Sequence, residues 1–177
     1  PRVGAVVARF FARDFPKTVR RRVHALLAAA LVFAAGLVFG AASFAADPGA
    51  GEVLWPFGHR YMDPRERVAD EERSTVSMGE RTLGGTTFAA QLMTHNSRVT
   101  YLACGLAITG GIGTVLMIFA NGAYLGAVGA DYVQSGETEF LLAWIGPHGV
   151  IEIPVMLLGA AAGLILARAL FAPGRAG

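Results

Sequence analysis

Charge and cysteine are both scarce in this sequence. Only 16% of its residues are charged and 54% are apolar, whereas about a quarter of the residues in a soluble domain are charged. The net charge of +2 excludes a basic nucleic-acid-binding chain or a highly charged disordered one, so we expect no nucleic-acid partner. Its single cysteine, Cys104, can form neither an intrachain disulfide nor a thiolate metal cluster. Together these absences favour an integral membrane protein.

Lysine and arginine are missing from Val99 to Ala167, as is typical of a block embedded in a bilayer. By contrast, Arg2 to Arg22 contains seven basic residues and one acidic residue. Because positively charged segments stay on the cytoplasmic side, we predict a multi-pass protein of the inner or plasma membrane with a cytoplasmic N-terminus.

Residues 1–22 are predicted to form a basic amphipathic helix at the membrane interface. Its apolar residues recur at helical spacing, largely opposite the arginines: Val3, Val6, Val7, Phe10, Phe11 and Phe15. The alternative is an ordinary helix packed on preceding sequence, since the chain begins with Pro1 rather than Met. Pro16 is expected to end this helix.

Residues 23–46 are the first predicted transmembrane helix. His24 to Ala46 contains no acid, lysine or arginine, and a helix of that length spans about 34 Å. A cleavable signal peptide is the alternative, because small residues follow the apolar run. The length of the run favours a retained helix.

Residues 47–97 are predicted to be a polar extracytoplasmic excursion with short amphipathic helices. Asp63 and Pro64 have the types expected at a helix cap and first turn, predicting a helix from 64 to about 73. Phe88 and Leu92 suggest a second amphipathic piece at the interface. Four further residues fit either an aromatic belt or a loop core: Trp55, Pro56, Phe57 and Tyr61.

Residues 98–171 are predicted to be a membrane-embedded core of broken helices, followed by a tail at 172–177. As one helix, 99–133 would be about 52 Å long, so it must turn. Gly110–Gly113 and Asn121-Gly122 are the two places that invite a turn, and we favour Asn121. Phe140 to Gly146 is too short to cross and precedes Pro147-His148-Gly149, which predicts a re-entrant piece.

The predicted fold class is therefore all-α, a polytopic membrane helical bundle with short re-entrant or broken helices. We expect four main spans and cytoplasmic termini.

His148 and Glu152 are the main candidate functional residues, since ionisable groups inside a membrane usually mark functional sites. They are four residues apart and share a helix face. Three interpretations are open: a structural pair that holds the broken helix, a proton or ion relay, or the acid and base of an intramembrane hydrolase. The spacing matches no zinc-peptidase motif, and we predict neither a metal nor a cofactor.

Asn121 is predicted to satisfy the backbone at a helix turn, with pore lining as the alternative. Asp131, Glu137 and Glu139 are expected at the surface of a loop. Three glycine pairs have the spacing that lets membrane helices approach closely, namely Gly36/Gly40, Gly122/Gly126 and Gly159/Gly163. We expect them to pack helices within one subunit first, and to form a homodimer contact second.

Four segments of the sequence, taken in order, resemble the stage II sporulation protein M family. They are His95-Asn96-Ser97-Arg98-Val99, Gly111-Ile112-Gly113-Thr114, Asn121-Gly122 with Gly126, and Pro147-His148-Gly149-Val150-Ile151-Glu152. The resemblance implies a polytopic membrane protein with broken helices, and a motif set of Asn121, Gly122, Pro147, His148, Gly149 and Glu152 without catalytic assignment.

In endospore formers the namesake of this family works with septal peptidoglycan hydrolases during engulfment. By resemblance, we expect a non-enzymatic scaffold or recruiting subunit of an envelope-remodelling assembly. Its expected partners are membrane lipids, a second copy of the chain and cell-envelope proteins. A small transporter or flippase whose path passes His148 and Glu152 is the alternative, and an intramembrane hydrolase is a third.

Overall fold

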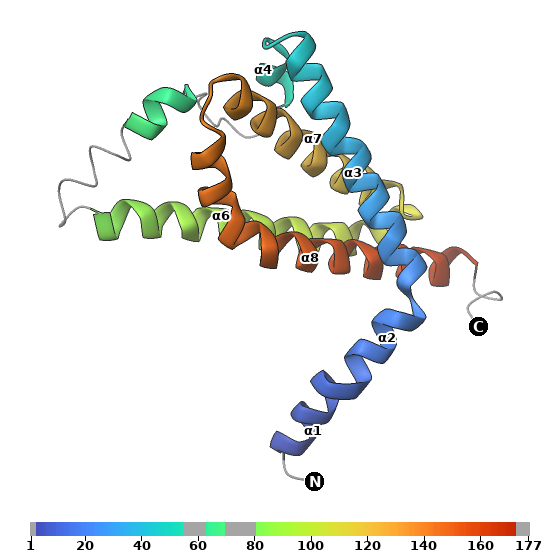
Figure 1. Ribbon diagram of the computed structural model, residues 1–177. Helices are drawn as coiled ribbons and strands as arrows, with labels where there is room; N and C mark the ends of the chain where they lie inside the picture. Colours follow the sequence, from blue (N-terminus) through green and yellow to red (C-terminus); the bar gives the residue numbers. More distant parts are fainter. Residues whose placement is uncertain (1–2, 55–62, 70–80, 173–177) are drawn as a thin grey trace.

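The computed structural model describes residues 3–54, 63–69 and 81–172, without the side chains of Glu52, residues 81–92, Pro147 and His148. Every regular element in these ranges is a helix (Figure 1), which confirms the predicted all-α class. Three helical segments are long and apolar enough to cross a membrane: α3 (Val23–Ala46), α7 (Ile112–Gln134) and residues Gly149–Phe171 of α8 (Thr138–Phe171). The protein is therefore a multi-pass helical membrane protein.

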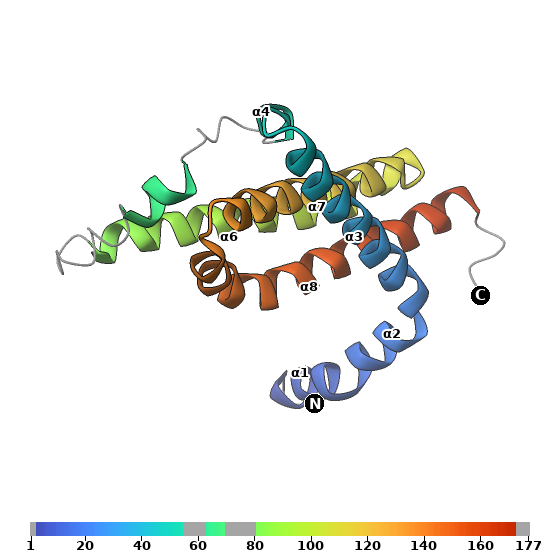
Figure 2. The same ribbon diagram turned by 45° about the horizontal axis from the view of Figure 1, so that its top comes forward.

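The N-terminal segment is helical on both sides of Pro16. It consists of α1 (Val3–Arg9), a π-helical turn η1 (Phe10–Asp14) and α2 (Phe15–Arg21). The expected end at Pro16 is wrong, because Pro16 lies in the first turn of α2, where proline's missing N–H and fixed φ are well tolerated. The chain changes direction at Arg22 instead, with φ −113° and ψ 19°, so α1 and α2 lead away from the other helices (Figures 1 and 2).

Helices α3 and α7 cross through two glycine pairs. The buried residues of α3 recur every three or four positions and include Gly36 and Gly40, so they form one face of the helix. This face contacts Gly122 and Gly126 of α7. A Cβ atom on Gly36, Gly40, Gly122 or Gly126 would overlap a backbone carbonyl oxygen of Phe119, Ala123, Phe33 or Leu37, respectively. The crossing therefore depends on the absence of side chains at these positions.

The third glycine pair joins α8 to α6 (Arg81–Gly105). A Cβ on Gly159 would lie 2.6 Å from Cγ2 of Thr100, and one on Gly163 would overlap the carbonyl oxygen of Ala103. Beside this contact, the buried Thr114 hydroxyl of α7 donates a 2.7 Å hydrogen bond to the same Ala103 carbonyl. All three glycine pairs thus pack helices within one subunit.

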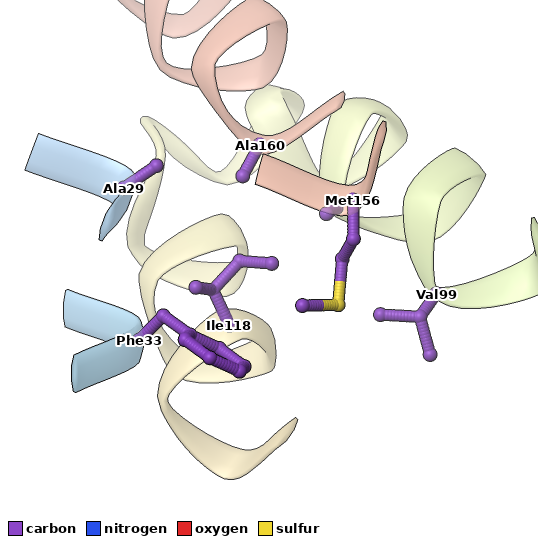
Figure 3. Close-up of a cluster of buried hydrophobic side chains, with 7 residues drawn as sticks. Ala29, Phe33, Val99, Ile118, Met156 and Ala160 are labelled. Carbon is purple, nitrogen blue, oxygen red and sulfur yellow. The ribbon is translucent and has the colours of Figure 1, made fainter. Parts of the chain in front are cut away.

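One apolar core connects the four long helices. It contains seven buried residues, drawn in Figure 3: Ala29 and Phe33 of α3, Val99 and Ala103 of α6, Ile118 of α7, and Met156 and Ala160 of α8. Three of the seven are alanines, whose small side chains keep the helix backbones close. The larger Phe33, Ile118 and Met156 fill the space between the crossings.

The contacts also give the helix directions. Gly36 and then Gly40 of α3 approach Phe119 and then Ala123 of α7, so α3 and α7 run in the same direction. We call the side of the bundle where α3 begins proximal and the side where it ends distal. Because α3 and α7 run in the same direction, the chain must return from the distal to the proximal side between them. α6 is the described element that makes this return. α6 therefore runs between the two sides of the bundle, beside the three helical segments that are long and apolar enough to span a membrane.

The chain turns between α6 and α7 at a pair of glycines rather than at Asn121. After α6, a short 3-10 helix η2 (Leu106–Thr109) leads to Gly110 and Gly111, which have φ of 69° and 89°. Such left-handed angles are readily adopted by glycine. Helix α7 then continues through Asn121, so the predicted turn at Asn121 is wrong. Glycine conformational freedom decides between the two positions.

Helix α8 is continuous across the segment predicted to break. Its hydrogen-bonded helix runs from Thr138 to Phe171 and includes Pro147 and Gly149, so the predicted break of the helix at Pro147-His148-Gly149 is wrong. The part near the α7–α8 turn points in a different direction from the rest of α8 (Figure 1). Since proline commonly kinks a helix without ending it, the sequence Pro147-His148-Gly149 accompanies a bent helix.

Substitution of Gly126 should separate close packing from helix propensity. Gly126→Ala places a methyl group against the Leu37 carbonyl and should destabilise the protein by about 1–3 kcal/mol through overpacking. Gly129→Ala is the matched control, because a Cβ there meets no atom within 4 Å, so it should be neutral or stabilising by up to about 1 kcal/mol. Thermal unfolding in mild detergent measures both, and equal stability of the two variants would contradict the crossing.

The passage of α6 is tested by sidedness in sealed vesicles. Single cysteines replace Lys17, Glu66, Ile108 or Glu137 in a Cys104→Ala background and react with a membrane-impermeant thiol reagent. The fold predicts that Lys17 and Ile108 are labelled from one side, and Glu66 and Glu137 from the other. Labelling of Ile108 and Glu66 from the same side would show that α6 does not cross.

Candidate functional site

Asn96 and Glu152 form a polar contact between α6 and α8. The Asn96 side-chain amide donates a hydrogen bond to Oε2 of Glu152, and the pair is partly buried. One turn further along α6, the Thr100 hydroxyl donates a 2.9 Å hydrogen bond to the Asn96 carbonyl. Thr100 also contacts Gly159. The glycine contact therefore brings the two helices close enough for an amide and a carboxyl group to meet.

Glu152 lies within the apolar part of α8. Apolar residues precede it from Phe140 to Gly146 and follow it from Ile153 onward. A carboxyl group there is costly unless it has a partner, and Asn96 is that partner.

The other residues of the predicted site lie at different places. The side chains of Pro147 and His148 are outside the described residues, so the predicted contact of His148 with Glu152 falls outside them too. Gly149 contacts Ile145 and Ile153 of its own helix. Asn121 donates a 2.9 Å hydrogen bond to the Met117 carbonyl one turn earlier in α7, so it satisfies the backbone within a continuous helix and not at a turn. Gly122 belongs to the crossing with α3.

The predicted site thus did not include Asn96 as the partner of Glu152. Asn96 is part of the first motif segment of the sequence. Its neighbours in the chain are also polar, so no local pattern indicated that Asn96 packs against α8. Spacing alone favours partners on the same helix. Contact across helices depends on how α6 and α8 are aligned, which the sequence around either residue does not specify.

A second polar cluster lies on the distal side, where residues 64–69 form a short helix. As predicted, Asp63 caps this helix: its Oδ1 accepts a 2.8 Å hydrogen bond from the Arg65 backbone N–H. The predicted continuation to residue 73 passes outside the described residues, as do the aromatic residues at 55–61. The Arg65 side chain donates to the Ser135 carbonyl at 3.1 Å, which attaches the helix to the α7–α8 turn.

Aromatic rings strengthen this attachment. The Arg67 guanidinium lies 4.1 Å from the centre of the Trp144 ring, within the range of a cation–π interaction. The Tyr132 ring stacks with both Trp144 and Phe140, whose ring centroids lie 6.3 Å and 6.1 Å away. We call Arg65, Arg67, Tyr132, Phe140 and Trp144 the distal clasp. It holds part of the polar excursion against the ends of α7 and α8.

Asp131 is buried beside this clasp, with only 6% of its surface exposed. The prediction that Asp131 lies at a loop surface is therefore wrong. It occupies the last turn of α7, which packs inward next to Tyr132, whereas Glu139 in the first turn of α8 is exposed. The nearby Gly136 has a φ of 83° and forms the turn between the helices.

The chemistry available at the Asn96–Glu152 contact is that of a hydrogen-bonded amide and carboxyl group. In the described part of the chain, no group of three His, Cys, Asp or Glu side chains is arranged to hold a metal ion. An amide can orient a carboxyl group and stabilise its charged form, but it does not exchange protons with it. The contact is thus suited to joining two helices.

Removing one partner should reveal the strength of this contact. Asn96→Ala leaves the Glu152 carboxyl without its donor and should lower stability by about 1–2 kcal/mol, the range for strong hydrogen bonds between membrane helices. Ser97→Ala, at an exposed neighbouring position, is the control and should change little. A double-mutant cycle with Glu152→Ala, measured by thermal unfolding in detergent, isolates the pairwise coupling. Additive effects would show that the contact contributes nothing.

Comparison with known proteins covers most of the chain. Residues 29–177 match the stage II sporulation protein M family. An uncharacterised protein of the archaeon Methanocaldococcus jannaschii is 33% identical over 73 residues, which is 41% of this chain and 41% of that protein. The chain thus aligns with less than half the length of this relative. No solved structure matches.

The family match includes α7, α8, the Asn96–Glu152 contact, the glycine turn and α3 from Ala29 onward. It leaves out α1, η1, α2 and the first turns of α3. On the extent of this match, the chain belongs to the stage II sporulation protein M family.

Proposed function

We propose that this protein is a non-enzymatic membrane scaffold, a recruiting subunit of an envelope-remodelling assembly. The observation that supports this most is the pairing of Glu152 with Asn96. The carboxyl group of the membrane-embedded motif is used to join two helices, with an amide that cannot relay protons. Such a contact adds rigidity, which is what a platform for other proteins requires.

The distal clasp adds a second supporting observation. Arg65 attaches the helix at 64–69 to the α7–α8 turn, and Arg67 attaches it to Trp144 of α8. Part of the polar excursion is therefore held in a defined place above the membrane helices. In this proposal the excursion is extracytoplasmic and contacts cell-envelope proteins. The orientation follows from the basic residues before α3, which favour a cytoplasmic N-terminus in the inner or plasma membrane.

A homodimer is part of this proposal, but it must use surfaces other than the glycine pairs. Gly36, Gly40, Gly122 and Gly126 are occupied by the α3–α7 crossing, and Gly159 and Gly163 contact α6. Large apolar side chains on the outer face of α3 remain exposed, including Leu31 and Val38. They offer a lipid-facing surface for a second copy of the chain.

Transport is the competing function, and Glu152→Gln separates the two. Glutamine keeps the shape of the side chain and can still accept a hydrogen bond from Asn96, so a scaffold should keep its partners within about twofold. A proton or ion relay through Glu152 should instead lose its flux, because an amide does not titrate. Glu139→Gln, at an exposed position, is the matched control.

Two measurements on the same variants decide between these functions. Affinity capture from native membranes with quantitative identification of co-purifying envelope proteins tests the scaffold. Proton flux into vesicles containing the purified protein and a pH-sensitive dye tests the relay. Stable partners that persist in Glu152→Gln support the proposal. A flux that wild type and Glu139→Gln show, and Glu152→Gln lacks, would overturn it.

A further inference from the structure

The N-terminal helix presents an exposed aromatic cluster. Phe10, Phe11 and Phe15 are 47%, 65% and 39% exposed, and their rings contact one another, with centroids 5.1 Å apart for Phe10–Phe11 and 6.1 Å apart for Phe10–Phe15. Val3 and Val7 are exposed as well. No residue of α1, η1 or α2 is buried, so nothing in the described part of the chain covers this apolar surface.

The π-helical turn explains how the cluster forms. In an uninterrupted α-helix, residues five apart point about 140° away from each other. The backbone N–H of Phe15 bonds to the carbonyl of Phe10, a five-residue step that brings both side chains to the same side. The turn therefore keeps the apolar residues of α1 in line with the first residue of α2. Without the π-helical turn, the Phe15 side chain would point away from the apolar side chains of α1.

The opposite surface of the helix is basic. Four cations line one shallow hollow together with Ala12 and Pro16: Arg13, Lys17, Arg20 and Arg21. Asp14 is the single acidic residue of this segment, and it forms an exposed ion pair with Arg9 at 3.6 Å. The segment thus combines a strongly positive side with a side of large apolar residues.

The position of this helix identifies what covers its apolar side. Its last residue, Arg21, is separated from the first membrane-spanning residue, Val23, by Arg22 alone, so α2 ends at the boundary of the membrane. There the chain turns away from the axis of α3 (Figure 1). The surface nearest to the exposed phenylalanines is then the lipid bilayer itself, and the charge of the helix is complementary to acidic headgroups.

We propose that α1, η1 and α2 bind an anionic lipid surface on the proximal side of the membrane. The phenylalanines and valines insert at the level of the upper acyl chains, and the long arginine and lysine side chains extend to lipid phosphates. This segment precedes the family match, which begins at residue 29. The lipid-binding proposal does not rest on the scaffold function.

The test uses the full chain in vesicles, with an environment-sensitive fluorophore on a single cysteine in a Cys104→Ala background. Val7→Cys places the fluorophore on the apolar side, and Ala12→Cys, which lines the basic hollow, is the matched control. The vesicles contain phosphatidylcholine alone or with phosphatidylglycerol as about a third of the lipid. We expect an apolar environment for the Val7 probe in the anionic vesicles, reversed by high salt, while the Ala12 probe remains in water.

Charge variants of exposed residues give the second measurement. Arg13→Gln and Lys17→Gln should each reduce the ratio of inserted to free helix about fivefold, whereas Asp14→Asn should increase it. Equal emission of the Val7 probe in neutral and anionic vesicles would overturn the proposal. The proposal would also be overturned if the Val7 probe reported an apolar environment only at high protein density. That result would assign the apolar side of the helix to a second copy of the chain.

Discussion

The close approach of helix backbones at glycine is the constraint on which the rest of this structure depends. Inside a bilayer, apolar side chains gain nothing by leaving lipid for protein, so helices associate where their surfaces fit closely. Gly36 and Gly40 contact α7 in this way, and Gly159 and Gly163 contact α6. These contacts set which helices are neighbours, and their order along each helix sets the direction in which the helices run.

The polar features are consequences of that alignment. Because Gly159 lies against Thr100, Glu152 comes level with Asn96 and finds its hydrogen-bond donor there. Ser135 in the α7–α8 turn and Trp144 in the second turn of α8 lie on the distal side, where Arg65 and Arg67, respectively, contact them. Satisfaction of each polar group is needed, since a polar group left unpaired in lipid costs several kcal/mol. The fold thus couples its membrane helices to the polar segment outside them.

The bundle of long helices and the N-terminal segment present different kinds of surface. The four long helices are held by packing within the protein, and α3, α7 and α8 expose leucine, isoleucine or valine on their outer faces. The N-terminal segment makes few contacts with the bundle and has an apolar side and a basic side. The first arrangement needs no specific lipid, whereas lipid binding by the second, as proposed above, depends on lipid charge.

Composition and the distribution of charge were sufficient to predict a helical membrane protein, the span at 23–46 and the cap at Asp63, because these depend on local chemistry. Glycine spacing also indicated which faces pack, since in a helix that is apolar all round only small residues distinguish one side. The glycine run at Gly110–Gly113 was one of two turn positions that the sequence offered, and the left-handed angles of Gly110 and Gly111 place the turn there. The burial of Asp131 and the partner of Glu152 were decided by the tertiary structure. Each depends on the register between helices far apart in sequence, which is set by backbone contacts such as Gly159–Thr100 and has no local signature.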